Sequence, residues 1–254
     1  MSKTTQHIAV MRLSAMGDVA MTVPVLRALV NQHPNVKITL ISRPFFQPFF
    51  EGIPNVSFFA FDEKERHKGF LGLLWLYRDL KALKIDAFAD LHNVLRSKII
   101  RNLFAFSGKK MAFVDKARAD KKALTRAENK IFRQLPSIFE RHVKVYEKLG
   151  FTVDLFHPKF PNKAILSDKI KAIIDIKKEN ATSKLIGIAP FAQYDSKVYP
   201  LDLMQEVIDQ LALHTNYKIL LFGGGKKEIE QLMLFAANKE NVVNCAGKIS
   251  FQEV

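Results

Sequence analysis

The 254-residue sequence has a single cysteine, Cys245, and no apolar run that approaches the ~18 residues of a membrane-spanning helix. One cysteine excludes a disulfide bond within the chain and is typical of proteins from a reducing compartment. The opening residues, MSKTTQHIAV, lack the apolar stretch of a secretory signal peptide. We therefore expect a protein that is cytoplasmic, or one that is bound to a membrane only at its surface.

The sequence also lacks the short motifs of several enzyme classes. It has no H-E-x-x-H or C-x-x-C pattern for a metal, and no G-x-S-x-G pattern for a serine hydrolase. The absence of G-x-G-x-x-G after the first expected strand counts against a dinucleotide-dependent oxidoreductase. A D-x-D pair that would hold Mg²⁺ against a nucleotide phosphate is missing too. We therefore expect no metal and no cofactor.

Acidic residues are few beside basic ones, with 25 Asp and Glu against 39 Lys and Arg, and the net charge is +14. The excess lies mainly in residues 96–148, which hold 15 basic and 5 acidic residues. Such a segment attracts phosphorylated substrates, anionic lipid headgroups or nucleic acid, although a solvated helical face is a simpler alternative. No recognised nucleic-acid-binding motif accompanies it, and we expect no nucleic-acid partner.

Short apolar runs alternate with stretches of helical spacing in the first part of the chain. We expect strands over residues 7–13, 37–42, 56–62, 86–92 and 111–114. We expect helices over residues 24–34, 69–84, 96–106 and 137–150, and partly ordered loop and helix over 116–134. Thr22 is a plausible cap and Pro24 suits the first turn of the first helix, while Gly150 is a good helix end.

Two prolines, Pro158 and Pro161, interrupt this pattern, and it then resumes. We place a boundary there, between domains of residues 1–160 and 161–254. The second part predicts strands over 184–190, 217–225 and 242–247, helices over 201–214 and 227–238, and a first helical turn at 250–254. The fold class is therefore α/β, with two Rossmann-like doubly wound domains. A doubly wound domain has about six strands, so we expect the second to be incomplete and the chain to be shortened.

In open parallel sheets ligands bind beyond the carboxyl ends of the strands. The first such loop contains the sequence SAMGD, in which Ser14, Ala15 and Gly17 let another molecule approach the backbone. Asp18 follows them. Its carboxylate is either a general base or the N-cap of the next helix, and local pattern leaves both interpretations open.

Two further loops follow strands of the second domain. Gln193, Ser196 and Lys197 precede the helix expected after Pro200, where a lysine and free backbone amides favour a phosphate; an exposed surface loop is the alternative. Residues 223–225 are three glycines, which allow close backbone approach but match neither dinucleotide nor P-loop spacing.

The segment RLSAMGDVAMTVPVLRAL resembles the opening motif of glycosyltransferase family 9, the ADP-heptose:lipopolysaccharide heptosyltransferases. Later segments are similar to further family motifs in the same order, and the resemblance covers nearly the whole chain. These segments are DLHNVLRSKIIRNL, RHVKVYEKLG, IAPFAQYDSKVYPLDLMQEVIDQL, LLFGGGKKEIE and NCAGKISFQEV.

The resemblance implies a GT-B fold with an N-terminal acceptor domain and a C-terminal nucleotide-sugar domain. It implies an inverting, metal-independent transfer of heptose from ADP-heptose to the Kdo–lipid A inner core of lipopolysaccharide. Asp18 is then the catalytic base and Lys197 meets the donor diphosphate. The enzyme would be a monomer on the cytoplasmic face of the inner membrane. The remaining donor-side positions are Gln193, Ser196, Gly224, Gly225, Lys248 and Ile249, and the acceptor-side positions are Ser14, Gly17, Arg96, Arg118 and Arg126.

The sequence departs from the family pattern at several points. Tyr199 replaces a tryptophan, His92 and Asn93 replace a glutamine-glycine pair, and Glu228 lies three positions beyond the usual acidic position. The family's [DS]-[TSH]-G-[PL]-x-H segment does not occur before Val254. We therefore keep open a different nucleotide-sugar donor, weakened catalysis in a shortened chain, and a binding protein that no longer catalyses.

Overall fold

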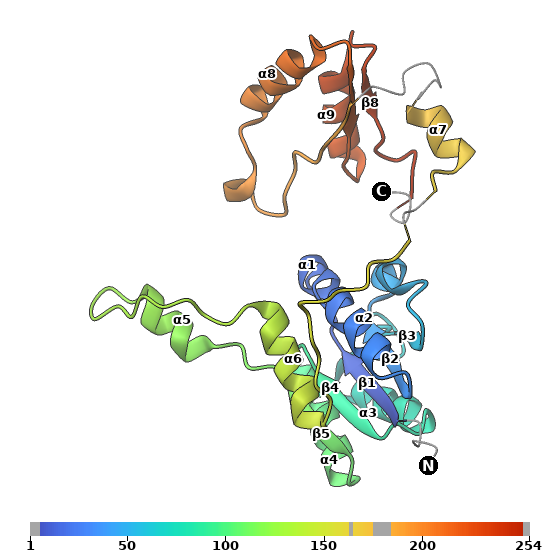
Figure 1. Cartoon of the computed structure of the whole chain (residues 1–254), viewed down its shortest axis with the longest axis vertical. Helices are drawn as coiled ribbons and strands as arrows, with labels where there is room; N and C mark the ends of the chain where they lie inside the picture. The colour runs from blue at the N-terminus through green and yellow to red at the C-terminus, as the bar shows by residue number, and fades with distance from the viewer. Residues whose placement is uncertain (1–5, 163–164, 175–183, 251–254) are drawn as a thin grey trace. The chain divides into compact units, whose positions relative to one another are not determined.

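The computed structural model describes residues 6–162, 165–174 and 184–250. The chain divides into two compact units, Met1–Pro161 and Asn162–Val254 (Figure 1). This division lies one residue from the position that the two prolines suggest. Both units are α/β, and both contain a parallel sheet, which confirms the predicted fold class.

The first unit is built on a five-stranded parallel sheet in the order β3-β2-β1-β4-β5. This order places β1 at the centre, and the buried run from Ile8 to Met11 explains why that strand is apolar on both faces. The strands are β1 (Gln6–Met11), β2 (Val36–Ser42), β3 (Val56–Ala60), β4 (Ala87–Asp90) and β5 (Lys110–Phe113).

Helices cover both faces of this sheet, and the alternation of side chains along β1 separates two cores. Ile8 and Val10 pack against α2 (Val23–Gln32) and α6 (Ile138–Leu149). Ala9 and Met11 pack against α3 (Gly69–Ala82) and α4 (Leu95–Phe106). Each fully buried aliphatic side chain contributes roughly 1.5–3 kcal/mol, so the two cores hold the loops at the sheet edge in place.

The residues predicted to begin and end two of the helices can be compared with the structure. Gly150 ends α6 in the left-handed conformation with φ 101°, as predicted, and Ser137 and Glu140 form a capping box at its start. Thr22 is the N-cap residue of α2, as predicted, but its side chain makes no capping hydrogen bond. Its hydroxyl donates to the carbonyl oxygen of Val19 at 2.6 Å and so is turned back toward the preceding turn.

Several short elements escaped prediction. These are α1 (Met16–Ala20), the 3-10 helix η1 (Pro44–Phe50) and, in the second unit, α7 (Asp168–Ile174). Each has seven residues or fewer, which is too short for a helical period to emerge. The basic stretch contains α5 (Arg118–Thr125), and in Figure 1 this segment extends away from the sheet of its own unit.

The second unit has three described strands in the order β6-β7-β8, all parallel. Ile219 and Leu221 pack on one face with α8 (Leu201–Ala212) and α9 (Lys226–Ala236), and the opposite face packs on α7. The strands are β6 (Lys184–Ile188), β7 (Tyr217–Leu221) and β8 (Val242–Asn244). The helical turn expected at 250–254 lies almost wholly outside the described residues. Within the described ranges, no helix has the length and apolar character to cross a bilayer.

Candidate functional site

The order of strands in the first unit indicates where a ligand would bind. The chain leaves β1 toward one side of the sheet and leaves β4 toward the other, so the two following loops separate at the carboxyl edge. In doubly wound sheets this switch point is where ligands bind. The loop after β1 begins at Arg12, and the loop after β4 begins at Leu91.

Arg12 joins the two loops. Its side chain is buried, and its Nη1 donates a hydrogen bond of 2.6 Å to the carbonyl oxygen of Leu91. The guanidinium also forms an ion pair with Asp18, whose side chain is 50% exposed. Burial lowers the pKa of Arg12, and the paired carboxylate opposes that effect. A half-exposed carboxylate is thus fixed at the switch point by a buried cation.

The structure overturns one of the two interpretations of Asp18, that of a helix cap. The N-cap of α1 is Ala15, and Asp18 is the third residue of that helix, so the N-cap interpretation is wrong. A carboxylate in the first turn of a helix interacts favourably with the helix dipole. This effect does not explain why a buried arginine lies beside Asp18. The ion pair with Arg12 is therefore the feature of Asp18 that local sequence pattern missed.

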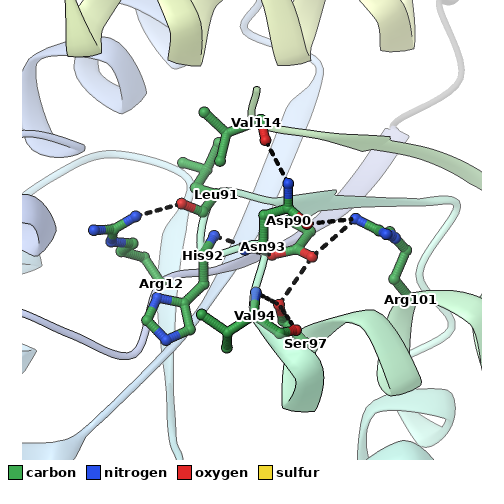
Figure 2. A network of polar contacts seen from close by, with 9 residues as sticks. All are labelled: Arg12, Asp90, Leu91, His92, Asn93, Val94, Ser97, Arg101 and Val114. Atoms are coloured by element: carbon green, nitrogen blue, oxygen red, sulfur yellow. Dashed lines mark hydrogen bonds and ion pairs between the residues drawn. The ribbon is translucent and has the colours of Figure 1, made fainter. Parts of the chain in front are cut away.

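A second buried network shapes the loop after β4 (Figure 2). Asp90 is completely buried and accepts hydrogen bonds from the backbone nitrogens of His92 and Asn93 at 3.0 and 2.7 Å. Its other oxygen accepts from Ser97 Oγ at 2.9 Å and from Arg101 Nη1 at 3.2 Å. A buried carboxylate with four donors is fully satisfied, so this loop has one well-defined conformation.

Asn93 explains one departure from the family pattern. Its φ is 46°, in the left-handed region that glycine and asparagine tolerate best. Its Nδ2 also donates to the carbonyl oxygen of Val114 at 2.8 Å, a contact that a glycine could not make. The substitution of asparagine for glycine therefore preserves the turn and ties it to the loop after β5.

Positive charge surrounds Asp18. Burial, together with the nearby cations Arg12 and Lys116, lowers the pKa of His92 to about 4. Burial also lowers the pKa of Lys116, and Arg118 adds to that effect. His92 is therefore neutral at neutral pH, and the arginine and lysine side chains give the switch point a positive environment suited to an anionic ligand.

A cavity of about 470 Å³ opens beside this point, and it brings together two of the predicted acceptor residues, Ser14 and Arg96. Arg96 lies 3.6 Å from a carboxylate oxygen of Glu63 and 5.2 Å from the centre of the Phe61 ring. The cavity is lined by Leu13, Ser14, Arg43, Gly69, Phe70, Leu73, His92, Val94, Leu95, Arg96 and Ile99.

The other three predicted acceptor residues do not line this cavity. Gly17 is exposed in α1, two residues beyond the N-cap. Arg118 and Arg126 belong to the α5 segment, and the Arg126 guanidinium donates to the carbonyl oxygen of Asn129 within that segment. The sequence analysis also missed Arg12, which directly follows β1, and Lys116, which lies three residues beyond the end of β5. The available signal was a basic residue close to the end of a strand.

The predicted donor residues of the second unit all follow the carboxyl ends of its strands. Gln193, Ser196 and Lys197 are exposed in the loop after β6, and Lys197 Nζ lies 5.4 Å from the Tyr194 ring. The helix predicted beyond Pro200 is present, since α8 begins at Leu201. These residues therefore share one edge of the sheet, and their side chains are exposed to solvent.

The loops after β7 and β8 complete this edge. Gly224 donates its backbone N–H to Glu228 Oε2 at 2.7 Å, and Gly225 has φ 83° at the N-cap of α9. Lys248 is exposed, whereas Ile249 packs against the apolar cluster around Cys245. Over the described part of both units, no three His, Cys, Asp or Glu side chains are grouped to hold a metal ion.

Comparisons with known proteins agree with this architecture. The family model "Glycosyltransferase family 9 (heptosyltransferase)" matches residues 73–254. The lipopolysaccharide core heptosyltransferase OpsX of Haemophilus influenzae is 24% identical over 260 residues, which span the whole of this chain and 71% of that protein. A family 9 glycosyltransferase from Veillonella parvula superposes with a TM-score of 0.70 at 22% identity, over 98% of this chain and 72% of that one. The E. coli heptosyltransferase WaaC with ADP gives 0.65 at 18% identity, over 97% and 76%.

Proposed function

The chain belongs to glycosyltransferase family 9, the heptosyltransferases, and from this membership we propose that it transfers a heptose from ADP-heptose to the inner core of lipopolysaccharide. The family match shows that the chain is a glycosyltransferase. Support for the sugar and the acceptor comes from the similar proteins, one described as a lipopolysaccharide core heptosyltransferase and another solved with ADP.

The observation that favours a catalytic role for the first unit is the Arg12–Asp18 ion pair at the switch point. A general base must reach its substrate and must hold one orientation. Asp18 is half exposed and is held by a buried guanidinium, so it meets both requirements.

The proposed step is a direct displacement with inversion. The Asp18 carboxylate takes the proton of an acceptor hydroxyl, and the hydroxyl oxygen forms a bond to the anomeric carbon of the heptose. The bond from that carbon to the donor phosphate oxygen breaks on the opposite face, and ADP leaves with its electron pair. The products are the glycosylated acceptor, ADP and one proton.

The leaving diphosphate requires positive charge or backbone dipoles. In the second unit, Lys197 and Lys248 are exposed at the same sheet edge, close in sequence to the turns that begin α8 and follow β8. We assign the diphosphate to Lys197, with Gln193, Ser196 and the glycines at 224 and 225 as further donor contacts. In this proposal lysine and backbone groups neutralise the leaving group, and no metal is required.

The acceptor is an anionic glycolipid, and the positive surroundings of Asp18 favour its binding. Ser14 and Arg96 line the adjacent cavity and are the proposed acceptor contacts in the first unit. Since that acceptor lies in a membrane, the proposal places the enzyme at the cytoplasmic surface of the inner membrane. We propose that it acts there as a monomer.

The test is a transfer assay with the full chain, ADP-heptose and Kdo–lipid A, in which ADP release is measured. Asp18→Asn removes the base without changing the size of the side chain, so transfer should fall at least about a hundredfold while donor binding stays within about twofold. The matched control is Asp86→Asn, an exposed carboxylate at the opposite edge of the same sheet. Retention of most activity in Asp18→Asn would contradict the mechanism.

A different nucleotide-sugar donor is one of the alternatives within the same family. A set of ADP- and UDP-linked sugars, compared at equal concentration in this assay, distinguishes the two. Transfer from a donor other than ADP-heptose would keep the role of Asp18 and replace the assigned sugar.

A further inference from the structure

Helix α3 is apolar on the face that it exposes as well as on the face that it buries. Leu73, Leu76 and Leu80 pack into the core of the first unit. On the other side, Phe70 and Leu71 are 66% and 71% exposed, and Leu74 and Trp75 are 42% and 46% exposed. The four exposed positions follow the spacing i, i+1, i+4, i+5, so they form one stripe over the first two turns. We name these four residues the α3 stripe.

A helix that is apolar all round is normally buried or in contact with a partner. The α3 stripe has charged residues at its borders rather than in its middle. The guanidinium carbons of Arg66 and Arg78 lie 5.7 and 5.4 Å from the centre of the Trp75 ring, and Lys68 and Lys81 are exposed at the two ends of the helix. Trp beside Arg and Lys is the composition of side chains that lie at a membrane–water interface.

The stripe is continuous with the candidate acceptor cavity. Phe70 belongs to both, since it also lines the cavity with Ser14 and Arg96. Leu95, at the start of α4, lines the same cavity and is 76% exposed. The mouth of the cavity is thus bordered by exposed apolar side chains on α3 and α4.

We propose that the α3 stripe, with Leu95, is the surface by which the first unit docks on an anionic lipid bilayer, with the acceptor cavity opening at that interface. The bilayer is favoured over a protein partner by the basic residues beside Trp75, of which Arg66 is also paired with Asp79, and by the continuity with the cavity. This inference rests on the proposed function in one respect, that the acceptor is a membrane lipid. It differs from an assignment to the basic stretch around α5, whose exposed aromatic is Phe132.

Trp75 is the one tryptophan of the sequence, so its fluorescence reports directly on the proposed surface. The full chain is titrated with vesicles of phosphatidylethanolamine and phosphatidylglycerol, and separately with vesicles of phosphatidylcholine alone. With the anionic vesicles, the emission of Trp75 should shift to shorter wavelength and should become protected from acrylamide quenching. Leu71→Ser with Leu74→Ser should lower partitioning, measured by cosedimentation, about tenfold or more.

Phe106→Ser is the matched control, because Phe106 is 89% exposed in the same unit at the far end of α4. It should partition like the unchanged protein. Phe132→Ser tests the α5 segment in the same way. Cosedimentation without any change in Trp75 emission would overturn the proposal, as would loss of binding in Phe132→Ser alone. A Trp75 shift that depends on protein concentration without vesicles would assign the stripe to a second copy of the chain and would also overturn it.

Transfer assays separate a failure of this inference from a failure of the proposed function. The Leu71→Ser, Leu74→Ser variant should lose transfer to acceptor in vesicles but keep transfer to a deacylated, water-soluble acceptor. Loss with both acceptors would contradict a docking role. Absence of transfer by the unchanged protein would count against the proposed function. The Trp75 fluorescence would still test membrane docking, because that measurement does not depend on transfer.

Discussion

The guanidinium of Arg12 pairs with the carboxylate of Asp18 across the turn between β1 and α1, and the two side chains are 8% and 50% exposed. The same guanidinium donates to the carbonyl oxygen of Leu91. One buried cation therefore links the orientation of Asp18 to the loop after β4. An exposed ion pair would be weak, but burial of one partner and a second hydrogen bond make this one a rigid support.

Arg12→Gln tests this support. We expect kcat to fall roughly tenfold or more with little change in KM, because the base loses its orientation while the binding residues remain. In the Asp18→Asn background the same change should have no further effect, since Arg12 acts through Asp18. Steady-state kinetics of the two single variants and the double variant measure this coupling. Arg12→Lys keeps the charge and should recover part of kcat, whereas additive losses would mean that Arg12 acts independently.

Asp90→Ala should be among the most destabilising single changes in the first unit. It removes the acceptor of two backbone and two side-chain donors and leaves Arg101 buried without its carboxylate. The expected cost is about 3–5 kcal/mol, seen as a lower midpoint in urea or thermal unfolding. Asp154→Ala is the control in the same unit, and as an exposed carboxylate it should leave the midpoint nearly unchanged. Equal effects of the two changes would contradict the account of the network.

The architecture was largely predictable because its signals are local and repeated. The apolar run of β1 and the helix end at Gly150 each indicate one structure. The site was harder to predict. Local pattern leaves Asp18 open as a cap or a base, and it does not show that a buried arginine lies beside it. The orientation of Arg12 involves a hydrogen bond to Leu91, in the loop after β4. The conformation of Asn93 depends in the same way on a contact with Val114, 21 residues away. Contacts between residues that lie far apart in the sequence produce no periodic pattern in it.

His142 should make the stability of the first unit depend on pH. Burial lowers its pKa to about 4, with Arg12 and Arg141 acting in the same direction and Asp18 against it. In the unfolded chain the pKa returns to about 6.5, so between these values the unfolded state binds more protons. Stability is therefore complete above pH 6.5 and falls as the pH drops toward 4, by at most about 1.4 kcal/mol per pH unit.

His142→Leu should remove this contribution to the pH dependence, because leucine has no proton to bind and fills the same buried position. Urea unfolding at pH 7 and pH 5 gives the difference in the free energy of unfolding for each variant. His157→Leu is the control, since the side chain of His157 is 88% exposed. An unchanged difference in His142→Leu would show that other groups cause the loss of stability in acid.

Substitution by alanine should change the stability of the first unit at one glycine, Gly72, and not at another, Gly17. A Cβ at Gly72 would lie 2.2 Å from the backbone carbonyl carbon of His67, and backbone cannot move aside easily, so Gly72→Ala should lower the unfolding midpoint. A Cβ at Gly17 meets no atom within 4 Å, so Gly17→Ala should fold normally. If the acceptor approaches the backbone there, Gly17→Ala should raise KM for the acceptor several-fold at unchanged stability. Unchanged KM would remove Gly17 from the acceptor contacts.

Lys197→Ala should weaken the binding of ADP without changing the fold. Lys197 is exposed at the carboxyl edge of the second unit, and its Nζ lies 5.4 Å from the Tyr194 ring. Loss of one charged contact to a diphosphate corresponds to about 1.4 kcal/mol or more, that is, at least about a tenfold rise in Kd by calorimetry. Lys184→Ala is the matched control: Lys184 also lies over a tyrosine, 6.0 Å from the Tyr217 ring, but at the amino end of β6. Equal affinities in the two variants would move the diphosphate away from the loop after β6, and a raised Kd in Lys197→Ala alone would place it there.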